Sequence, residues 1–229
     1  MTGVRIAVVG GGIAGVSAAY HLVEAHPDAE VFLLEAEPVL AHHTTGRSAA
    51  ILLENLTTRP NLILTRASVD FLRDTPTDLV DVPLLSPRTV MHISSEAQSD
   101  QMDALLAEGS LLPSPSVELT VDEAMDYFPP LRRELVHRAV LEPDCADIDV
   151  SALHQAYVRG FRRGGGRITT SARVDAAQPD GNGWRLETTD GDVGADIVVN
   201  AAGAWGDVVA ARAGVEPIGL QPCRRTAFM

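Results

Sequence analysis

The chain has 229 residues, with 18 basic and 31 acidic side chains, so its net charge is -13. Every basic residue is an arginine, which excludes lysine Schiff-base chemistry and the phosphate-loop lysine of nucleotide hydrolases. The acidic balance also argues against nucleic-acid binding, which requires clustered positive charge.

The composition favours a globular protein with reduced cysteines. Apolar residues make up 45% of the chain and aromatic residues 4%, so aliphatic side chains must fill the core of one unit or two closely joined units. Cys145 and Cys223 lie far apart and form no metal-binding pattern, so we interpret them as free thiols of a cytoplasmic protein. The uncharged stretch 6–20 is interrupted by glycines and is too short to span a bilayer, so no targeting or integral membrane segment is expected.

The first 35 residues predict a strand, a glycine turn, a helix and a second strand. Apart from Arg5, residues 4–9 form an apolar run rich in β-branched residues, typical of a strand buried on both faces of a parallel sheet. Residues 16–25 have helical character and stop before Pro27, and residues 31–34 are again apolar. This order is the start of a βαβ unit.

The middle of the chain predicts alternating helices and short strands. The spacing predicts helices over 60–73 and 100–107 and a short strand within 84–93, and Thr120 with Glu123 forms a capping box. The acidic residues Glu142, Asp144, Asp147 and Asp149 are interpreted as a solvated loop, because the glycine and ligand spacing of a calcium loop are lacking.

The last third changes from helical to strand periodicity. A helix runs from a cap at Asp149 or Ser151 to Arg163, and glycine-containing turns at 180–183 and 190–191 predict hairpins. Residues 196–200 are predicted as a buried strand, followed by a helix to Ala213, and residues 223–229 as a final strand.

The motif Gly10-x-Gly12-x-x-Gly15 predicts dinucleotide binding, since it follows a strand and opens a helix. The first glycine allows the tight turn, the second lets the backbone approach a diphosphate, and the third lets the helix close on the sheet. Glu35 follows about 20 residues later, at the end of the second strand, where its carboxylate can accept ribose hydroxyls.

The loop after Glu35 favours FAD over NAD. Residues 42–50, HHTTGRSAA, are polar and contain glycine, and Arg47 could reach a diphosphate. Thr44, Thr45 and Ser48 supply hydroxyl groups to the diphosphate or to a ribityl chain. His42 and His43 are not expected to hold a metal, because adjacent histidines rarely bind one ion together.

The order of motifs resembles the D-amino-acid-oxidase-like FAD oxidoreductases, and within them the D-arginine and D-amino-acid dehydrogenase branch. The resemblance extends from the first strand to the last residue. The segments that carry it are GGGIAG, LLEAE, HHTTGRSAA, LLSPR, ADID with ALHQAYVRG, VVNAAGAWGD and LQPCRRTAF.

The resemblance implies a role for each matching residue. Glu35 would meet the adenosine ribose, Val174 the adenine through its backbone, and Arg225 the substrate carboxylate. Ala36 would be a further cofactor-binding residue. The diphosphate would lie on Gly10, Gly12, Ile13, Ala14 and Gly15, and the phosphates and flavin ring would be lined by Thr44, Thr45, Arg47, Ser48, Ala49 and Ala50. The end of the strand at residue 200 would lie beside the cofactor, with Ala201, Ala202, Gly203 and Trp205 nearest it.

Three positions depart from the D-arginine branch. Ile51, Leu56 and Val90 stand where that branch has histidine, tyrosine and glutamate, so basic D-amino acids are not expected as substrates. Members of the family also continue well past this length, so the chain is expected to be truncated.

The resemblance implies an α/β fold with a Rossmann-like FAD-binding domain built on a parallel sheet, over 1–80 and 142–216. It also implies an incomplete α+β substrate domain with antiparallel strands, over 81–141 and 217–229. The implied activity is oxidation of the Cα–N bond of a D-amino acid or related amine to an imine, with an unidentified electron acceptor. Three alternatives stay open: an FAD-dependent 2-hydroxy-acid or glycerol-phosphate oxidoreductase, a partial chain that only binds nucleotide, and a NAD-dependent dehydrogenase.

Overall fold

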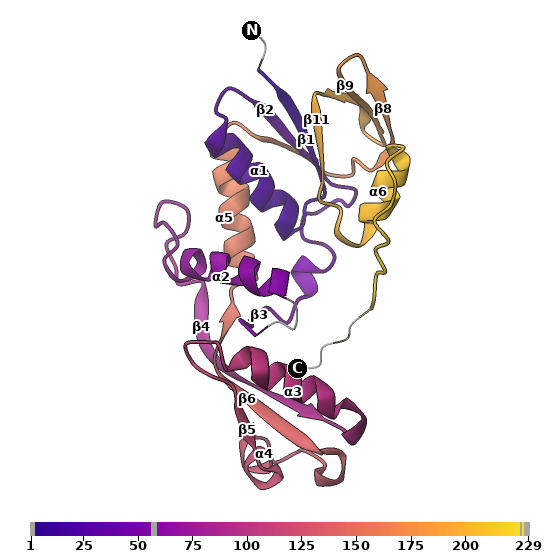
Figure 1. Ribbon diagram of the computed structural model, residues 1–229. Coiled ribbons are helices and arrows are strands. Elements are labelled where there is room, and N and C mark those ends of the chain that lie inside the picture. Colours follow the sequence, from indigo (N-terminus) through magenta and orange to yellow (C-terminus); the bar gives the residue numbers. More distant parts are fainter. Residues whose placement is uncertain (1–2, 56–58, 225, 227–229) are drawn as a thin grey trace. The chain divides into compact units, whose positions relative to one another are not determined.

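The computed structural model describes residues 3–55, 59–224 and 226 (Figure 1). The chain divides into two compact units: unit 1 comprises residues 1–49, 78–80 and 150–229, and unit 2 comprises residues 50–77 and 81–149. These boundaries differ from the predicted domains, because residues 50–77 and 142–149 fall in unit 2 and residues 217–224 in unit 1. Residues 51–52 and 142–148 join unit 2 through the hydrogen bonds of one antiparallel sheet. That unit 1 binds FAD and unit 2 substrate stays a prediction.

Unit 1 is built on the parallel sheet that the sequence predicts. Ala7, Val8 and Leu33 have no exposed surface, as expected for strands covered on both faces. The strand order is β11 (Ile197–Asn200), β1 (Arg5–Val9), β2 (Glu30–Leu34) and β7 (Arg167–Thr169), all parallel.

Two long helices of unit 1, α1 (Ile13–Ala25) and α5 (Val150–Arg163), pack against each other (Figure 1). Their contact is close: a Cβ on Gly160 would lie 2.6 Å from the Tyr20 ring. The rings of Tyr20 and Tyr157 lie 5.4 Å apart between centroids. Gly164–Gly166 follow α5, as predicted, and Gly165 has a φ of 85°.

A second sheet of unit 1 is an antiparallel meander, with order β10 (Gly191–Ala195), β9 (Gly183–Thr188) and β8 (Val174–Asp180). The predicted turn glycines adopt positive φ, 61° at Gly181 and 115° at Gly191, which a side chain would disfavour. Buried residues of the parallel sheet, the meander and α6 (Gly206–Arg212) form one apolar cluster.

Unit 2 is centred on one long strand, β6 (Arg138–Ile148). It pairs antiparallel with β4 (Leu85–Ser94) along one edge, and with β3 (Ile51–Leu52) and β5 (Val117–Leu119) along the other. The prediction that the acidic segment is a loop is therefore wrong in part, because residues 142–148 belong to the hydrogen-bonded strand β6. Proline is tolerated there because Pro143 and Asp144 lie opposite the single residue Thr89, in a bulge.

Helices cover both faces of this antiparallel sheet. Met102 and Leu105 of α3 (Ser99–Gly109) pack on Val140, whereas Ala124 of α4 (Val121–Tyr127) packs on Ala139. Thr120 caps α4 and forms the predicted capping box with Glu123. The remaining helix of unit 2, α2, spans Arg59–Arg73.

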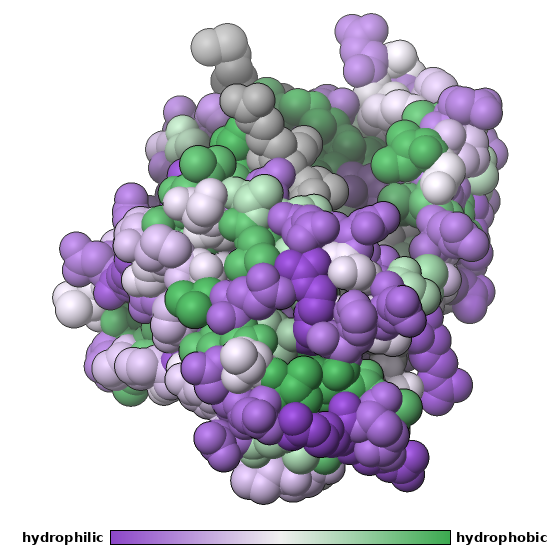
Figure 2. Space-filling view, turned by 60° about the horizontal axis from the view of Figure 1, so that its bottom comes forward, coloured by the Kyte–Doolittle hydropathy of each residue, from purple (hydrophilic) through white to green (hydrophobic). Residues whose placement is uncertain are grey.

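The segment after α6 has no regular secondary structure in its described residues. The strand predicted over 223–229 is absent at Cys223 and Arg224, and residues 225 and 227–229 lie outside the described part. Apolar residues reach the surface in several places on the face shown in Figure 2. Ile218 is 83% exposed and Leu111 71%, so the core does not account for the whole apolar content. No helix in the described part is long and apolar enough to cross a bilayer.

Candidate cofactor site

Unit 1 contains a cavity of about 590 Å³. Its walls come from the segments that follow β1, β2 and β11, and from the start of β8. This is the carboxyl edge of the parallel sheet, where open α/β folds bind their ligands. The volume lies in the range of small-molecule sites.

The glycine turn after β1 forms one wall, and its three glycines differ in their surroundings. Gly10 has a φ of 115°, and a Cβ on Gly15 would lie 1.8 Å from the Gly10 carbonyl oxygen. A Cβ on Gly12 would meet only the Thr45 hydroxyl, at 3.1 Å. Gly10 and Gly15 are thus required by the fold, whereas Gly12 leaves room for a ligand.

Glu35 is 9% exposed and lies at the end of β2, beside the glycine turn. Its Oε2 accepts a hydrogen bond from the Gly11 N–H at 2.6 Å, and its Oε1 accepts one from the Glu37 N–H at 2.8 Å. Each carboxylate oxygen can accept a further bond. Glu35 and Ala36 both line the cavity.

Only the first part of the polar loop after β2 lines the cavity. Thr44 and Thr45 line it, and the Thr45 hydroxyl accepts a hydrogen bond from the Ile13 N–H at 3.0 Å. Arg47 ends a short 3₁₀ turn, Thr45–Arg47, and is exposed. Among the described residues of unit 1, the wall includes Ile13 and Ala14 but not Gly15, Arg47, Ser48 or Ala49, and Ala50 belongs to unit 2.

The end of β11, beside the glycine turn, also lines the cavity through Ala201, Ala202, Gly203 and Trp205, and their predicted contact with the cofactor stays a prediction. A Cβ on Gly203 would meet nothing within 4 Å, and its φ is 54°. Behind this wall, the Asp207 carboxylate accepts hydrogen bonds from three consecutive N–H groups, those of residues 218–220, at 2.6 to 3.1 Å.

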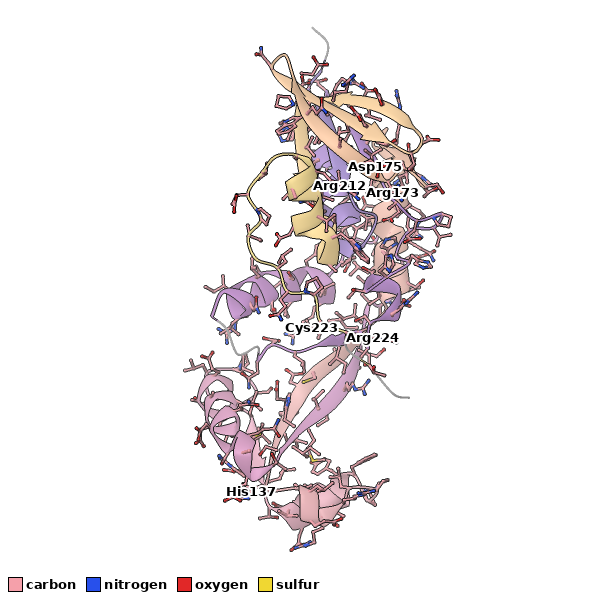
Figure 3. All side chains as sticks on the ribbon, turned by 90° about the vertical axis from the view of Figure 1, so that its right-hand side faces the viewer. His137, Arg173, Asp175, Arg212, Cys223 and Arg224 are labelled. Carbon is pink, nitrogen blue, oxygen red and sulfur yellow. The ribbon has the colours of Figure 1, made fainter. Side chains whose placement is uncertain are left out.

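Two arginines that sequence reasoning missed also line the cavity, Arg173 and Arg212 (Figure 3). Arg173 Nε donates to Asp175 at 2.8 Å, and this hydrogen bond holds the pKa of the Asp175 carboxyl below its ordinary value. Arg212 Nη1 donates to the Val174 carbonyl at 2.5 Å, the backbone predicted to meet adenine. Their sequence signal was weak, because isolated arginines are usually solvated surface residues.

Three side chains in the loop after β2 could hold a metal ion. The possible ligand atoms of Glu37, His42 and His43 lie within 4.8 Å of one another, whereas a tetrahedral zinc site brings them to roughly 3.4 Å. His43 Nε2 lies 2.9 Å from Glu37 Oε1, and the His43 ring lies 4.5 Å from the Trp205 ring. The distances are those of a His43 ring that is held on the cavity wall by Glu37 and by its contact with the Trp205 ring.

The predicted substrate residues are not gathered by the described part of the chain. Arg225, the predicted carboxylate-binding residue, and Leu56 both lie outside the described residues. Ile51 and Val90 lie on β3 and β4 of unit 2, opposite Asp147 and Glu142 of β6.

Unit 2 holds a buried polar group of its own. Glu142 is 3% exposed, and its Oε1 lies 2.7 Å from His92 Nε2. The neighbouring Cys145 thiol is buried, and burial together with the Glu142 charge raises its pKa to about 11. This thiol is therefore protonated at neutral pH and a poor nucleophile.

Comparison with known proteins gives one family for nearly the whole chain. The family model described as FAD dependent oxidoreductase matches residues 5–229. The match includes the glycine turn, Glu35, the polar loop and the end of β11.

Individual relatives are more distant. The chain is 22% identical to the L-2-hydroxyglutarate dehydrogenase of Indibacter alkaliphilus, over 90% of this chain and 52% of that protein. It is 27% identical to human mitochondrial dimethylglycine dehydrogenase, over 91% of this chain and 24% of that protein. The glycine oxidase structure from Geobacillus kaustophilus superposes with a TM-score of 0.76 at 23% identity, over 92% of this chain and 58% of that chain. The chain thus spans between about a quarter and somewhat more than half of these relatives.

Proposed function

Since the chain belongs to the FAD dependent oxidoreductase family, we propose that it carries the FAD site of an enzyme that oxidises the Cα–N bond of an amino acid or related amine. FAD is the cofactor of this family. The single observation that carries the proposal is the cavity of unit 1, in which a glycine turn, a buried carboxylate and the end of β11 face one space.

The residues around this cavity fit FAD. The absence of a side chain at Gly12 leaves the turn open to a diphosphate, and the N-terminus of α1 adds free N–H groups and partial positive charge. Glu35 keeps acceptor capacity for the two hydroxyl groups of the adenosine ribose. The residues expected to contact the flavin end are Thr44, Thr45 and Ala201–Trp205.

Charge neutralisation must come from side chains other than lysine. The arginines on the cavity wall are Arg173 and Arg212, next to Val174. We therefore assign them, rather than Arg47, the task of balancing the cofactor's negative charge. His43, held by Glu37, is a third candidate donor on the same wall.

The substrate would be an amino acid with an apolar side chain. When bound, FAD supplies a hydride acceptor at the flavin N5. Arg225 would bind the substrate carboxylate with two parallel hydrogen bonds. Ile51 and Val90 would offer no charge to a basic side chain, so D-leucine or D-methionine should exceed D-arginine and D-lysine. The free thiols Cys145 and Cys223 suit a cytoplasmic location.

A 2-hydroxy acid is the second candidate, because a dehydrogenase named for L-2-hydroxyglutarate matches over 90% of this chain. Carboxylate recognition by an arginine would serve both classes of substrate. The difference lies in whether an amine or a hydroxyl is oxidised.

Purification followed by a substrate screen tests the proposal. The protein should be yellow with a flavin absorption spectrum, and anaerobic addition of an apolar D-amino acid should bleach it. Glycine, dimethylglycine, D-arginine, L-2-hydroxyglutarate and glycerol 3-phosphate form the comparison arms. Bleaching by a hydroxy acid alone would replace the amine reaction with the second candidate, and a colourless protein that binds no added FAD would refute the cofactor site.

A further inference from the structure

His154 makes a long-range contact to the glycine turn. It lies on α5, is 6% exposed, and its Nε2 lies 3.0 Å from the Gly11 carbonyl oxygen. The two residues are 143 positions apart in the sequence. Helical periodicity alone places His154 on a packing face and gives it no partner.

Because the partner of His154 is a carbonyl oxygen, the hydrogen bond determines which ring nitrogen carries the proton. A carbonyl oxygen can only accept, so His154 Nε2 must carry the hydrogen. The same oxygen accepts a second bond from the Ala41 N–H at 3.2 Å, and the Gly11 N–H is held by Glu35 at 2.6 Å. Gly11 is thus fixed on both sides of its Cα, although glycine has the freest backbone.

Fixing the Gly11 carbonyl also fixes the N–H of the next residue. The two groups belong to one peptide plane and point in opposite directions when the bond is trans, and the structure has no cis peptide bond among its described residues. Gly12 lines the cavity. Within residues 3–55 and 59–224, no protein atom accepts a hydrogen bond from the Gly12 N–H.

We propose that His154 is a positioning residue of the cofactor site, which holds the Gly11–Gly12 peptide so that the Gly12 N–H is presented to the cofactor diphosphate. The inference rests on the proposed FAD site and adds a residue that does not touch the cavity. Without the imidazole, the Gly11 carbonyl would keep only the longer hydrogen bond from the Ala41 N–H. Rotation of the less restrained peptide would turn a carbonyl oxygen, instead of an N–H, toward a negatively charged group.

A pair of substitutions separates positioning from packing. His154→Leu fills similar space without a donor, whereas His154→Gln retains an N–H at a comparable reach. The dissociation constant of FAD, measured by quenching of flavin fluorescence, should rise about tenfold in H154L, the range of one lost hydrogen bond. H154Q should stay within about twofold of the parent. Leu153→Ala, at a buried neighbour on the same helix, should lower the melting temperature with little effect on the dissociation constant.

Fragments of the cofactor show which part of FAD loses binding affinity in H154L. ADP contains the diphosphate, so H154L should weaken ADP binding by the same factor as FAD binding, and adenosine binding should not change. Equal losses for adenosine, or equal FAD affinities in H154L and the parent, would overturn the inference. A parent protein that binds neither FAD nor ADP would instead overturn the proposed function, and this inference with it.

A measurement on the unsubstituted protein avoids the question of folding. Long-range proton–nitrogen NMR correlation of the imidazole should show His154 with a proton on Nε2. A neutral ring protonated only at Nδ1 could not donate to the Gly11 carbonyl and would overturn the assignment, whatever the variants do.

Discussion

Among the residues that the structure describes, each unit buries one glutamate, and the two accept hydrogen bonds from different kinds of donor. Glu35 in unit 1 is held by the backbone N–H groups of Gly11 and Glu37, and Glu142 in unit 2 by the imidazole of His92. A backbone N–H is held in place by the chain, whereas an imidazole can rotate away about its side-chain bonds. The Glu35 carboxylate is thus fixed by the backbone, whereas the Glu142 carboxylate depends on side chains, on His92 and, at 4.0 Å, on the Cys145 thiol.

This contrast teaches where substitutions should act. Changes near Glu35 should alter the glycine turn and ligand binding, because the carboxylate and the turn share hydrogen bonds. Changes near Glu142 should alter the stability of the antiparallel sheet, since β4 and β6 carry the pair.

The largest effect is expected for Gly15→Ala in unit 1. The new Cβ would lie 1.8 Å from the Gly10 carbonyl oxygen, so helix α1 or the turn must move, at a cost of about 3 kcal/mol. Hydrogen exchange should show lost protection in the parallel sheet. Gly12→Ala is the matched control, since its Cβ would meet only the Thr45 hydroxyl, at 3.1 Å, which a small side-chain shift relieves; it should fold and lose FAD affinity. A G15A protein as stable as the parent would contradict the close packing.

The second largest effect is expected for removal of the His92 imidazole in unit 2. His92→Leu leaves the buried Glu142 carboxylate with only the weak contact from the Cys145 thiol. It should lower the free energy of unfolding by about 2 kcal/mol, a value reduced because His92 is partly exposed. Urea denaturation measures this change. The double variant H92L/E142L should recover most of the loss, and a double variant no more stable than H92L would show that the pair is not the cause. FAD affinity should not change.

A smaller change in stability is expected for Glu35→Gln. The amide NH₂ would face one of two backbone N–H donors, so one hydrogen bond is lost, at about 1–2 kcal/mol. FAD affinity should fall about tenfold because the ribose also loses a charged acceptor. Fluorescence titration measures it, with the exposed Glu216→Gln as control. If E35Q and E216Q bind FAD equally, Glu35 has no part in the site.

The mildest test modifies thiols and leaves the fold intact. At pH 8 a thiol with a pKa of about 11 has a thiolate fraction about 100-fold below one with a pKa of 9. A disulfide reagent should therefore label the exposed Cys223 quickly and Cys145 only after unfolding. Fast labelling of two thiols in the native protein would contradict the burial of Cys145.

The same thiol gives a pH dependence with a defined sign. The pKa of Cys145 is higher in the folded protein, so its contribution to stability is present below about pH 9 and is lost as the pH rises through about 11. Urea unfolding of the parent should become easier across this interval, and Cys145→Ala should show a smaller change. Equal slopes would remove Cys145 as the cause.

Unit 1 was predictable from sequence because its determinants are local. Gly10 and Gly15 mark a turn and a close helix contact within six residues, and Gly181 and Gly191 mark tight turns. Such glycines indicate directly where the backbone needs a positive φ or a close approach. The contacts of Arg173, Arg212 and His154 were missed because their partners depend on tertiary packing.

Unit 2 was harder to predict because β6 does not look like a strand. Glu142, Pro143 and Asp144 have low strand propensity, and together they suggest a loop. The strand exists because β4 pairs along its whole length and a bulge accommodates the proline. The predicted role of Arg225 depends on residues that the described part of the chain does not include.

The position of β1 in the parallel sheet has a consequence for folding. It pairs with β2 soon after in the chain, but its other neighbour, β11, begins at residue 197. During synthesis, one edge of β1 must therefore stay unpaired until residues 197–200 have emerged, while the antiparallel strands β4 and β6 of unit 2 can pair earlier. Long-range pairing of this kind slows folding and leaves an apolar strand edge open to aggregation. Slower translation before residue 200 would prolong that exposure, and chaperone binding during synthesis should concentrate on the first strand.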